Sequence, residues 1–410
     1  MLGPVRRSTA ILPALFSSLT ACAAAGDDDT GSDATATTTA ATAEPTTADP
    51  PDTTPGTTVD PPTTSDAATS NSTSDASSDG GDDSSTGEPP AAPAVHYVGR
   101  HDASDPGHVR MGWSGVGAVV RFAGTGASVR LDDNGRYWTV VVDGQVQPTL
   151  ATAPGEQLYP LATGLAPGEH TVELYRRTEG SFGPTVMSGF ELEGELLAPP
   201  PVQRRIEIVG DSITCGYGDE GVSPCSFSAE TENHYLTYGA VAARALGAEL
   251  STVAWSGKGV VNNFGDDVFE PLPQIYDRLL ASDGAPWSFA WQPDAVVINL
   301  GTNDFSTDDD PPEAVFVPAY VAFLAHLRDV YPDAFILAVA PTLFGDEATM
   351  VSGYLQSAVD QRHMAGDAEV AFANVNVDWI GSGCDGHPTV ATHAGMGARL
   401  TEELQAHLGW

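Results

Sequence analysis

Basic residues are scarce in this 410-residue sequence, which has 17 Lys and Arg against 55 Asp and Glu and a formal net charge of -38. A surface this acidic repels the phosphates of nucleic acids and of anionic lipids, so we exclude nucleic acid as a partner. Long apolar runs are also lacking, because beyond the N-terminus no segment has the length and apolarity of a membrane helix. Neutral substrates fit this composition better than charged ones.

Several motifs of well-known enzyme classes are missing as well. No H-E-x-x-H sequence and no paired Cys/His spacing suggests a metal site, and no Gly-rich nucleotide loop occurs. The G-x-S-x-G elbow is absent, which argues against a typical α/β-hydrolase lipase. We therefore expect neither a metal nor a cofactor.

The N-terminus has the features of a bacterial export signal. Arg6 and Arg7 precede the apolar stretch AILPALFSSLTA, which runs up to Cys22 and is too short to span a bilayer. The sequence Leu-Thr-Ala-Cys at 19–22 resembles a lipobox, which implies cleavage before Cys22 and a lipid on its sulfur. The alternative is an ordinary secretory signal with an incidental cysteine. Either way we expect an exported protein, anchored at the bacterial cell surface or periplasmic face only through this lipid, or else secreted.

Composition divides the chain into four parts. After the signal peptide at 1–22, residues 23–94 are almost all Ala, Thr, Ser, Asp, Gly and Pro without Lys or Arg, and such a segment cannot bury enough apolar surface to offset its chain entropy. We expect a disordered acidic tether there. Residues 95–198 carry strand signals only, which predict an all-β sandwich or jelly roll. Residues 202–410 follow a Pro-rich linker and alternate strands with helices.

Two glycines separate neighbouring strand-like runs in the β region. The runs GAVVRFAG and ASVRLDD alternate polar and apolar residues, and Gly124 and Gly126 between them are typical of a turn.

The alternation in 202–410 predicts a three-layer α/β domain with a parallel sheet. Ligands of such sheets bind at the carboxyl ends of the strands, so we expect the functional residues there. The strand-like runs are 206–209, 250–255, 295–300, 335–340 and 370–375, and the helical patterns are 235–246, 314–330, 348–362 and 393–408.

Ser212 follows the first of these strands directly, in the sequence RIEIVGDSITCGYG. The residues after it, up to Tyr217, have the pattern of a helix start. A serine in this place is either the cap of that helix or a nucleophile close to a helix N-terminus, whose dipole favours a developing oxyanion. The serine alone does not decide between the two.

A base for Ser212 would have to come from the C-terminal sequence GCDGHPTVATH. Asp385 and His387 are two residues apart in a Gly/Pro-rich loop, so an extended loop would put both side chains on one face and let the carboxylate orient the ring. Thr392 has the place of an N-cap of the last helix, which makes His393 a packed residue of its first turn. We therefore favour His387 as the base.

Donors for an oxyanion follow two further strands. Asn303, in INLGTND, has an amide that could donate, and Gly257 or Gly259, in AWSGKG, could present a backbone N–H. The alternative for each glycine is turn geometry. We expect Asp304 to hold its loop rather than to react.

The order of these motifs resembles the motif blocks of SGNH (GDSL-type) hydrolases. The motifs are GDS at 210–212, the glycine loop at 256–259, GTND at 301–304 and a C-terminal Asp/His pair. The wider sequence GDSITCGYG…TENHYLTYGA…AWSGKG…HPTVATH is similar to the acetyl-xylan esterases of carbohydrate esterase family two. The resemblance covers roughly 95–410. It implies a three-layer, flavodoxin-like SGNH domain preceded by a jelly-roll domain.

The resemblance also implies residue roles. Ser212 is the nucleophile, His387 the base and Asp385 the residue that orients it, with the Ser212 N–H, a Gly257 or Gly259 N–H and the Asn303 amide as oxyanion donors. One departure stands out, because the broad family separates Asp and His by two residues and here only Gly386 lies between them. The spacing of Asp385 and His387 therefore differs from that of the broad family.

Three cysteines remain after Cys22, and export permits a disulfide between two of them. Cys225 and Cys384 lie in loops that flank the expected site, where a bridge would fix the loop of Asp385 and His387. We favour that pair, with Cys215–Cys225 as the competitor and Cys215 otherwise a buried thiol.

From these features we predict a monomeric, exported serine esterase that removes acetyl groups from a xylan- or mannan-type polysaccharide through an acetyl-enzyme. The alternatives are an SGNH esterase acting on other esters, such as a lipid, a cell-wall glycan or an aryl ester, and a non-catalytic carbohydrate-binding surface lipoprotein.

Overall fold

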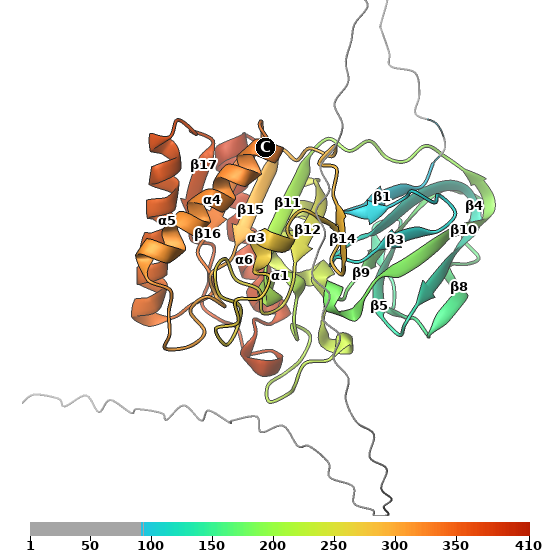
Figure 1. The fold of residues 1–410 in the computed structure, drawn as a ribbon. Coiled ribbons are helices and arrows are strands. Elements are labelled where there is room, and N and C mark those ends of the chain that lie inside the picture. The colour runs from blue at the N-terminus through green and yellow to red at the C-terminus, as the bar shows by residue number, and fades with distance from the viewer. Residues whose placement is uncertain (1–91, 93) are drawn as a thin grey trace, which may run out of the picture. The chain divides into compact units, whose positions relative to one another are not determined.

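A computed structural model describes residue 92 and residues 94–410, and all of these belong to one compact unit. The expected signal peptide, the lipidation site at Cys22 and nearly all of the expected tether lie outside the described residues. No helix within the described part of the chain has the length and apolarity needed to cross a membrane. Two main sheets follow one another along the chain (Figure 1).

The first sheet is antiparallel throughout, and its path runs β2-β3-β10-β4-β9-β5-β6. The long strand β4 is its centre, because β1, β8, β9 and β10 all pair with it. The strands are β1 (His96–Val98), β2 (His101–Asp102), β3 (Val109–Met111), β4 (Gly117–Asp133), β5 (Tyr137–Val142), β6 (Gln145–Val146), β7 (Leu150–Ala151), β8 (Gly155–Ala162), β9 (Gly168–Arg176) and β10 (Thr185–Leu196).

Gly124 and Gly126 lie inside β4, so the turn predicted at these glycines is wrong. They serve close packing instead. A Cβ atom on Gly124 would lie 2.2 Å from the carbonyl oxygen of Glu193 in β10, a distance that only glycine permits.

The second sheet is parallel, with strand order β12-β11-β15-β16-β17. The direction in which strands are added reverses between β11 and β15, and ligands bind beside such a reversal in open α/β sheets. The strands are β11 (Arg205–Gly210), β12 (Glu249–Ala254), β15 (Ala295–Asn299), β16 (Phe335–Val339) and β17 (Val370–Ala373), and the helices are α1 (Ser212–Cys215), α2 (Tyr238–Leu246), α3 (Leu272–Ile275), α4 (Glu313–Val330), α5 (Gly345–Met364) and α6 (Val390–Leu408).

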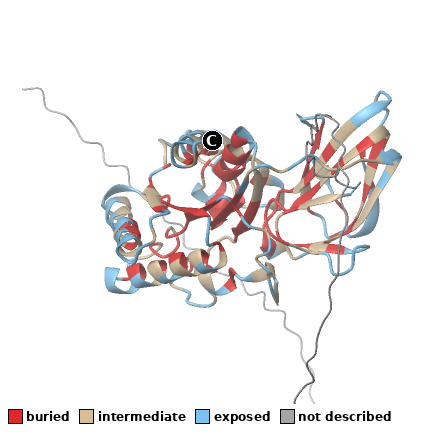
Figure 2. Ribbon diagram, turned by 90° about the horizontal axis from the view of Figure 1, so that it is seen from above, coloured by how far each residue is buried: buried red, intermediate tan, exposed pale blue. Residues whose placement is uncertain are grey.

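Helices cover both faces of the parallel sheet. Side chains of α4 and α5 share one apolar cluster with alternate strand residues such as Val296 and Ile298, while α2 and α6 share the other cluster with Ile208 and Val297. Figure 2 shows the same division, with buried strands between helices whose outer sides are exposed. The strands are apolar nearly throughout because both of their faces are covered.

Two helix ends differ from the sequence expectations. Helix α1 is a single turn that ends at Cys215, because Gly216 adopts the left-handed conformation (φ 86°). Helix α6 begins at Val390, and its N-cap is Thr389, whose hydroxyl accepts a hydrogen bond from the Thr392 N–H. The prediction that Thr392 is the cap is therefore wrong by one turn, since both threonines have the residue type that caps favour.

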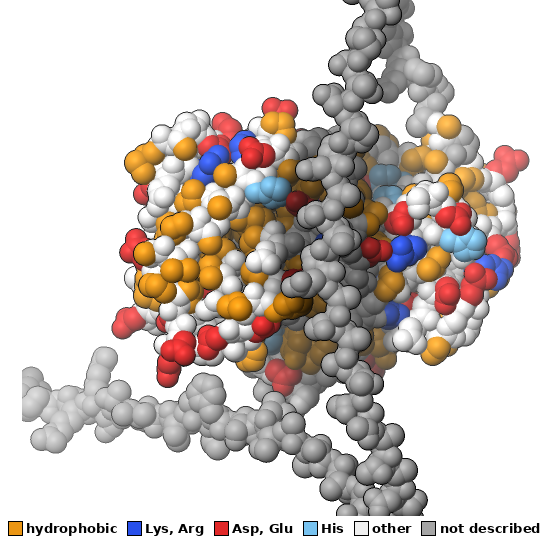
Figure 3. All heavy atoms as spheres, viewed as in Figure 1, with side chains coloured by type: hydrophobic (Ala, Val, Ile, Leu, Met, Phe, Trp, Pro, Cys, Tyr) orange, Lys and Arg blue, Asp and Glu red, His pale blue; other side chains and the backbone are white. Residues whose placement is uncertain are grey.

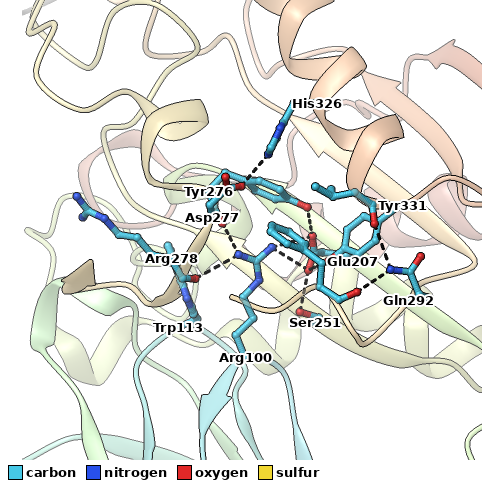
Figure 4. A network of polar contacts seen from close by, with 12 residues as sticks. Arg100, Trp113, Glu207, Ser251, Tyr276, Asp277, Arg278, Gln292, His326 and Tyr331 are labelled. Carbon is cyan, nitrogen blue, oxygen red and sulfur yellow. Dashed lines mark hydrogen bonds and ion pairs between the residues drawn. The ribbon is translucent and has the colours of Figure 1, made fainter. Parts of the chain in front are cut away.

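A buried ion pair joins the two sheets (Figure 4). Arg100, from the turn between β1 and β2, lies 3.2 Å from the carboxylate of Glu207 in β11, and both side chains are fully buried. The guanidinium also donates to the carbonyls of Tyr276 and Arg278, in the segment around β13 (Arg278–Leu280) that pairs with β14 (Asp283–Pro286). Hydroxyl groups of Ser251, Tyr276 and Tyr331 donate to the Glu207 carboxylate. Every charge at this junction is thus hydrogen-bonded.

Acidic side chains occur all round the rim of the face shown in Figure 3, and Lys and Arg are few there. This distribution agrees with the composition and again disfavours anionic polymers as ligands.

Breaking the buried pair should be costly, since a charge without a partner would remain in the interior. We predict that Glu207→Gln lowers the free energy of unfolding by about 3–5 kcal/mol. Urea denaturation at pH 7 measures this. The control is Glu191→Gln, which breaks the exposed pair between Arg130 and Glu191 and should change stability by less than about 1 kcal/mol. Equal effects of the two substitutions would contradict the importance we give to the junction.

Candidate active site

The register of the parallel sheet brings three loops to one edge. Gly210, the last residue of β11, pairs with Ala254 of β12 on one side and with Asn299 of β15 on the other. All three strands run in the same direction, so the segments that follow them leave the sheet side by side. Ser212, the glycine loop and Asn303 belong to these three segments.

Ser212 is the first residue of α1 and is not its cap. The N-cap is Asp211, whose carboxylate accepts a hydrogen bond of 3.0 Å from the Ile213 N–H. The turn is tightly packed, because a Cβ on Gly210 would lie 1.9 Å from the Thr214 hydroxyl oxygen. Because Asp211 is the cap, the Ser212 side chain takes no part in capping. Ser212 is 8% exposed.

His387 reaches Ser212 from the far end of the chain. Its Nε2 lies 2.8 Å from the Ser212 Oγ, a hydrogen bond between residues 175 positions apart. Burial lowers the pKa of His387 below its usual range, so the ring is neutral near pH 7 and can accept a proton from the hydroxyl. His393, by contrast, is buried in the first turn of α6 and accepts from the Tyr238 N–H at 3.3 Å. Its pKa falls to about 3 because of burial.

The loop before His387 is fixed by covalent and backbone links. A disulfide joins Cys225 to Cys384, the pair that the sequence favours, and Cys215 is a free, buried thiol. The Cys384 N–H donates to the Gly218 carbonyl at 3.0 Å. The base is thereby tied to the same segment that follows the serine.

Asp385 does not orient the imidazole, contrary to the expectation from its spacing. The 3₁₀ turn Cys384–Gly386 places Asp385 in the left-handed region (φ 49°) rather than in an extended strand. Its exposed carboxylate accepts hydrogen bonds from the Tyr217 hydroxyl at 3.1 Å and from the Phe227 N–H at 2.8 Å. Because the loop turns here, residues 385 and 387 do not share a face.

The other edge of the imidazole has no side-chain partner. Among the described residues no acceptor lies in hydrogen-bonding geometry with the buried Nδ1 of His387, although the backbone carbonyls of Asp385 and Cys384 lie close enough to raise its pKa somewhat. The flat face of the ring is covered instead. Tyr217 stacks on it with ring centroids 4.2 Å apart, a contact that the sequence analysis missed because only the folded loop creates it.

The expected oxyanion donors gather at the same edge, and the structure separates the two glycines. The Gly259 N–H donates to the Asn263 side chain at 3.3 Å, and Asp304 binds the N–H groups of 260–262, so it holds this loop as expected. Gly257 (φ 78°) donates to no acceptor among the described residues. The Asn303 amide donates to the Lys258 carbonyl at 2.9 Å and to Asp211 at 3.3 Å.

The first sheet contributes a residue to this edge. Glu179, just after β9, accepts a hydrogen bond of 2.7 Å from the N–H of Ser256, the neighbour of Gly257.

Glu179, Cys215 and Glu232 are buried with potential ligand atoms within 4.8 Å of one another, the arrangement of a possible metal site. Burial raises the pKa of Cys215 and of Glu232 well above their usual ranges. Within the cluster the Cys215 thiol donates to the Glu179 carboxylate at 3.4 Å, and the Glu179 N–H donates to the Glu232 carboxylate at 3.1 Å.

A separate cavity of about 290 Å³ lies at the opposite end of the parallel sheet, where β12 begins. Its lining includes His96, Tyr175, Tyr235 and Glu249 but not Ser212 or His387. The Trp291 N–H donates to Glu249 in the same region at 2.7 Å.

Two family descriptions match consecutive parts of the chain. "Carbohydrate esterase 2 N-terminal" matches 97–201, and "GDSL-like Lipase/Acylhydrolase family" matches 208–395. "Cellulase/esterase CelE" of Acetivibrio thermocellus is 40% identical over 329 residues, which are 78% of this chain and 40% of that protein. This chain therefore spans well under half of that relative's length. "Acetylxylan esterase / glucomannan deacetylase" of Cellvibrio japonicus is 29% identical over 78% of this chain and 90% of its own length.

Solved structures show the same relation. A family two carbohydrate esterase from Clostridium thermocellum in complex with cellohexaose is 39% identical, with a TM-score of 0.74 over 77% of this chain and 100% of that one. A Corynascus family 2 enzyme is 34% identical, with a TM-score of 0.70 over 77% of this chain and 100% of that one. Since both of its sheet regions match and solved relatives are covered along their full length, this chain belongs to carbohydrate esterase family two.

Proposed function

We propose that the protein is an exported serine esterase that removes acetyl groups from a plant-type polysaccharide such as xylan or mannan. The observation that carries this proposal is the 2.8 Å contact between the Ser212 Oγ and the His387 Nε2 at the carboxyl edge of the parallel sheet. A hydroxyl and a neutral imidazole in this relation form a nucleophile with its base. The names of the relatives, which include acetylxylan esterase and glucomannan deacetylase, support the substrate class.

In the first half-reaction the Ser212 Oγ attacks the acetyl carbonyl carbon while its proton moves to the His387 Nε2. The tetrahedral intermediate carries a negative oxygen. We assign the Ser212 N–H, the Gly257 N–H and the Asn303 amide as its donors. Gly257 is preferred to Gly259 because the latter's N–H already donates to Asn263. Collapse breaks the bond to the sugar oxygen, which takes the proton from His387 and leaves an acetyl-enzyme.

In the second half-reaction water takes the place of the sugar hydroxyl. His387 accepts a proton from the water as its oxygen attacks the acetyl carbon, and returns it to the Ser212 Oγ when acetate leaves. The charge balances without a metal or cofactor in either half. Asn303 must give up one of its two present hydrogen bonds to donate, and the 3.3 Å bond to Asp211 is the longer of them.

We further propose the organisation that the sequence indicates around this site. The protein is a monomer whose signal peptide is removed before Cys22, and a lipid on that residue anchors it through the acidic tether. Residues 95–198 form a jelly-roll domain and residues 202–410 a three-layer, flavodoxin-like SGNH domain. The parallel strand order and the helices on both faces of the sheet support the second assignment.

We predict that Ser212→Ala and His387→Ala each reduce acetate release from acetylated xylan or glucomannan by about 10³-fold or more, because each removes the attacking group or its base. The measurement is an acetate-release screen over acetylated glycans, long-chain acyl esters and aryl acetates. His108, an exposed histidine of the first sheet region, gives a matched control. His108→Ala should leave the rate unchanged.

Two outcomes of this screen would contradict the proposal. Preference for long acyl esters over acetylated glycans would favour a different ester substrate. Polysaccharide binding by wild type and by Ser212→Ala, without hydrolysis by either, would make the protein a binding lipoprotein.

The pH dependence follows from the environment of His387. The ring must be neutral to act as a base, so kcat/KM should be maximal above its pKa and fall as the pH drops through it. Burial lowers this pKa below the ordinary value of 6.5, and we predict an acidic midpoint of the kcat/KM profile below that value. An acidic midpoint above it, measured with an aryl acetate, would show that burial does not control the base.

A further inference from the structure

We propose that Tyr217 positions the His387 imidazole by stacking on its face, the task that an orienting carboxylate performs in a serine triad. The inference rests on the proposed function, since it needs His387 as the base. Tyr217 is a positioning residue here, because it acts through the imidazole and touches no reacting atom.

The imidazole has one fixed edge and one covered face. Its Nε2 is bonded to the Ser212 Oγ, but its buried Nδ1 has no acceptor in hydrogen-bonding geometry among the described residues. The Asp385 and Cys384 carbonyls lie near the ring but outside hydrogen-bonding geometry, so polar contacts fix its rotation only weakly. The Tyr217 ring, 4.2 Å away and inclined by 30°, restricts that rotation by contact with the whole face.

Tyr217 is itself held on its far side by an aromatic column. The Phe227 ring stacks on it at 3.9 Å with an interplanar angle of 13°, and the Phe182 ring contacts Phe227 at 5.9 Å. Phe182 comes from the first sheet region and Phe227 from the loop that bears Cys225. The column therefore connects His387 to the first sheet region and to the loop that the Cys225–Cys384 disulfide fixes.

Asp385 has a place in this arrangement, although it does not contact the imidazole. Its carboxylate accepts from the Tyr217 hydroxyl and from the Phe227 N–H, so it ties the two stacked residues together. The carboxylate is exposed, which limits the strength of its charge interactions. Asp385 thus steadies the column at its edge, and the column steadies the base.

The chain places Tyr217 five residues after Ser212. Helix α1 ends at the left-handed Gly216, and this turn directs Tyr217 toward the loop of His387. Gly218, which directly follows Tyr217, packs closely on Cys384. A Cβ on Gly218 would lie 2.7 Å from the Cys384 Cβ. One short segment therefore supplies both the nucleophile and the face against which the base rests.

During acylation the imidazole becomes positively charged. A cation over an aromatic face is stabilised by the ring quadrupole, so Tyr217 also favours the state that His387 reaches when it takes the serine proton. Stacking should therefore affect the chemical step more than the binding of substrate.

The test compares Tyr217→Leu and Tyr217→Met, which remove the aromatic face, with Tyr217→Phe, which keeps it and loses only the hydroxyl. We expect kcat for an aryl acetate to fall by about 10- to 100-fold in the Leu and Met variants with little change in KM. We expect the Phe variant to retain wild-type kcat within about threefold, and Asp385→Ala to behave like it.

A spectroscopic readout tests the stack in the wild-type protein. The ring protons of His387, assigned by their loss in His387→Gln, should resonate upfield of those of the exposed His108 because they lie over an aromatic ring. The shift should persist in Tyr217→Phe and disappear in Tyr217→Leu. Absence of the upfield shift in wild type overturns the proposal even if no Tyr217 variant folds.

Other outcomes also decide the matter. Wild-type kcat in the Leu and Met variants would overturn the proposal, and so would equal losses in Phe and Leu, which would assign the effect to the hydroxyl. These results are separable from a failure of the proposed function, which would appear in the wild-type protein as a preference for long acyl esters or as polysaccharide binding without hydrolysis. An inactive Ser212→Ala with a fully active Tyr217→Leu would overturn only the role of Tyr217.

Discussion

The shared register of β11, β12 and β15 is the constraint on which the candidate site depends. These parallel strands end level with one another, since Gly210 pairs with both Ala254 and Asn299. The short segments that follow therefore begin about 5 Å apart per strand step. Three groups of different chemistry meet at one point although they are distant along the chain. A slip of one register in any of the strands would move its segment away from the others.

The antiparallel region belongs structurally to this site. Arg100 inserts a fully buried cation against the middle of β11, and Glu179 fixes the N–H of Ser256 beside Gly257. The first contact determines where β11 lies against the other sheet, and the second determines the start of the glycine loop. Both contacts would be lost if the two regions separated. We infer that the two regions act as one rigid support for the reacting groups.

The sequence was informative where a pattern is local and ambiguous where a contact is created by the fold. Alternating apolar strands and helices predicted the parallel sheet, and the position of Ser212 after the first strand, with His387 in the C-terminal loop, led to the two groups that the structure brings within 2.8 Å. Asp385 was misjudged because its role depends on a left-handed turn that spacing does not reveal. Gly124 was misjudged for a related reason, since close packing of two strands and a turn both select glycine. Tyr217 had no signal at all, because its partner lies 170 residues further along the chain.

An aromatic face suits this site better than a third buried carboxylate would. Asp211 and Asp304 are already buried at the same edge, and burial raises the pKa of both, that of Asp211 to about 7. Another carboxylate next to His387 would add negative charge to a poorly solvated region that already holds Asp211 and Asp304. It would raise the pKa of these two aspartates further. In a chain with a net charge of -38 few basic residues remain to compensate it. Stacking fixes the imidazole without adding charge to this buried edge. The exposed Asp385 then contributes only through its hydrogen bonds with Tyr217 and Phe227.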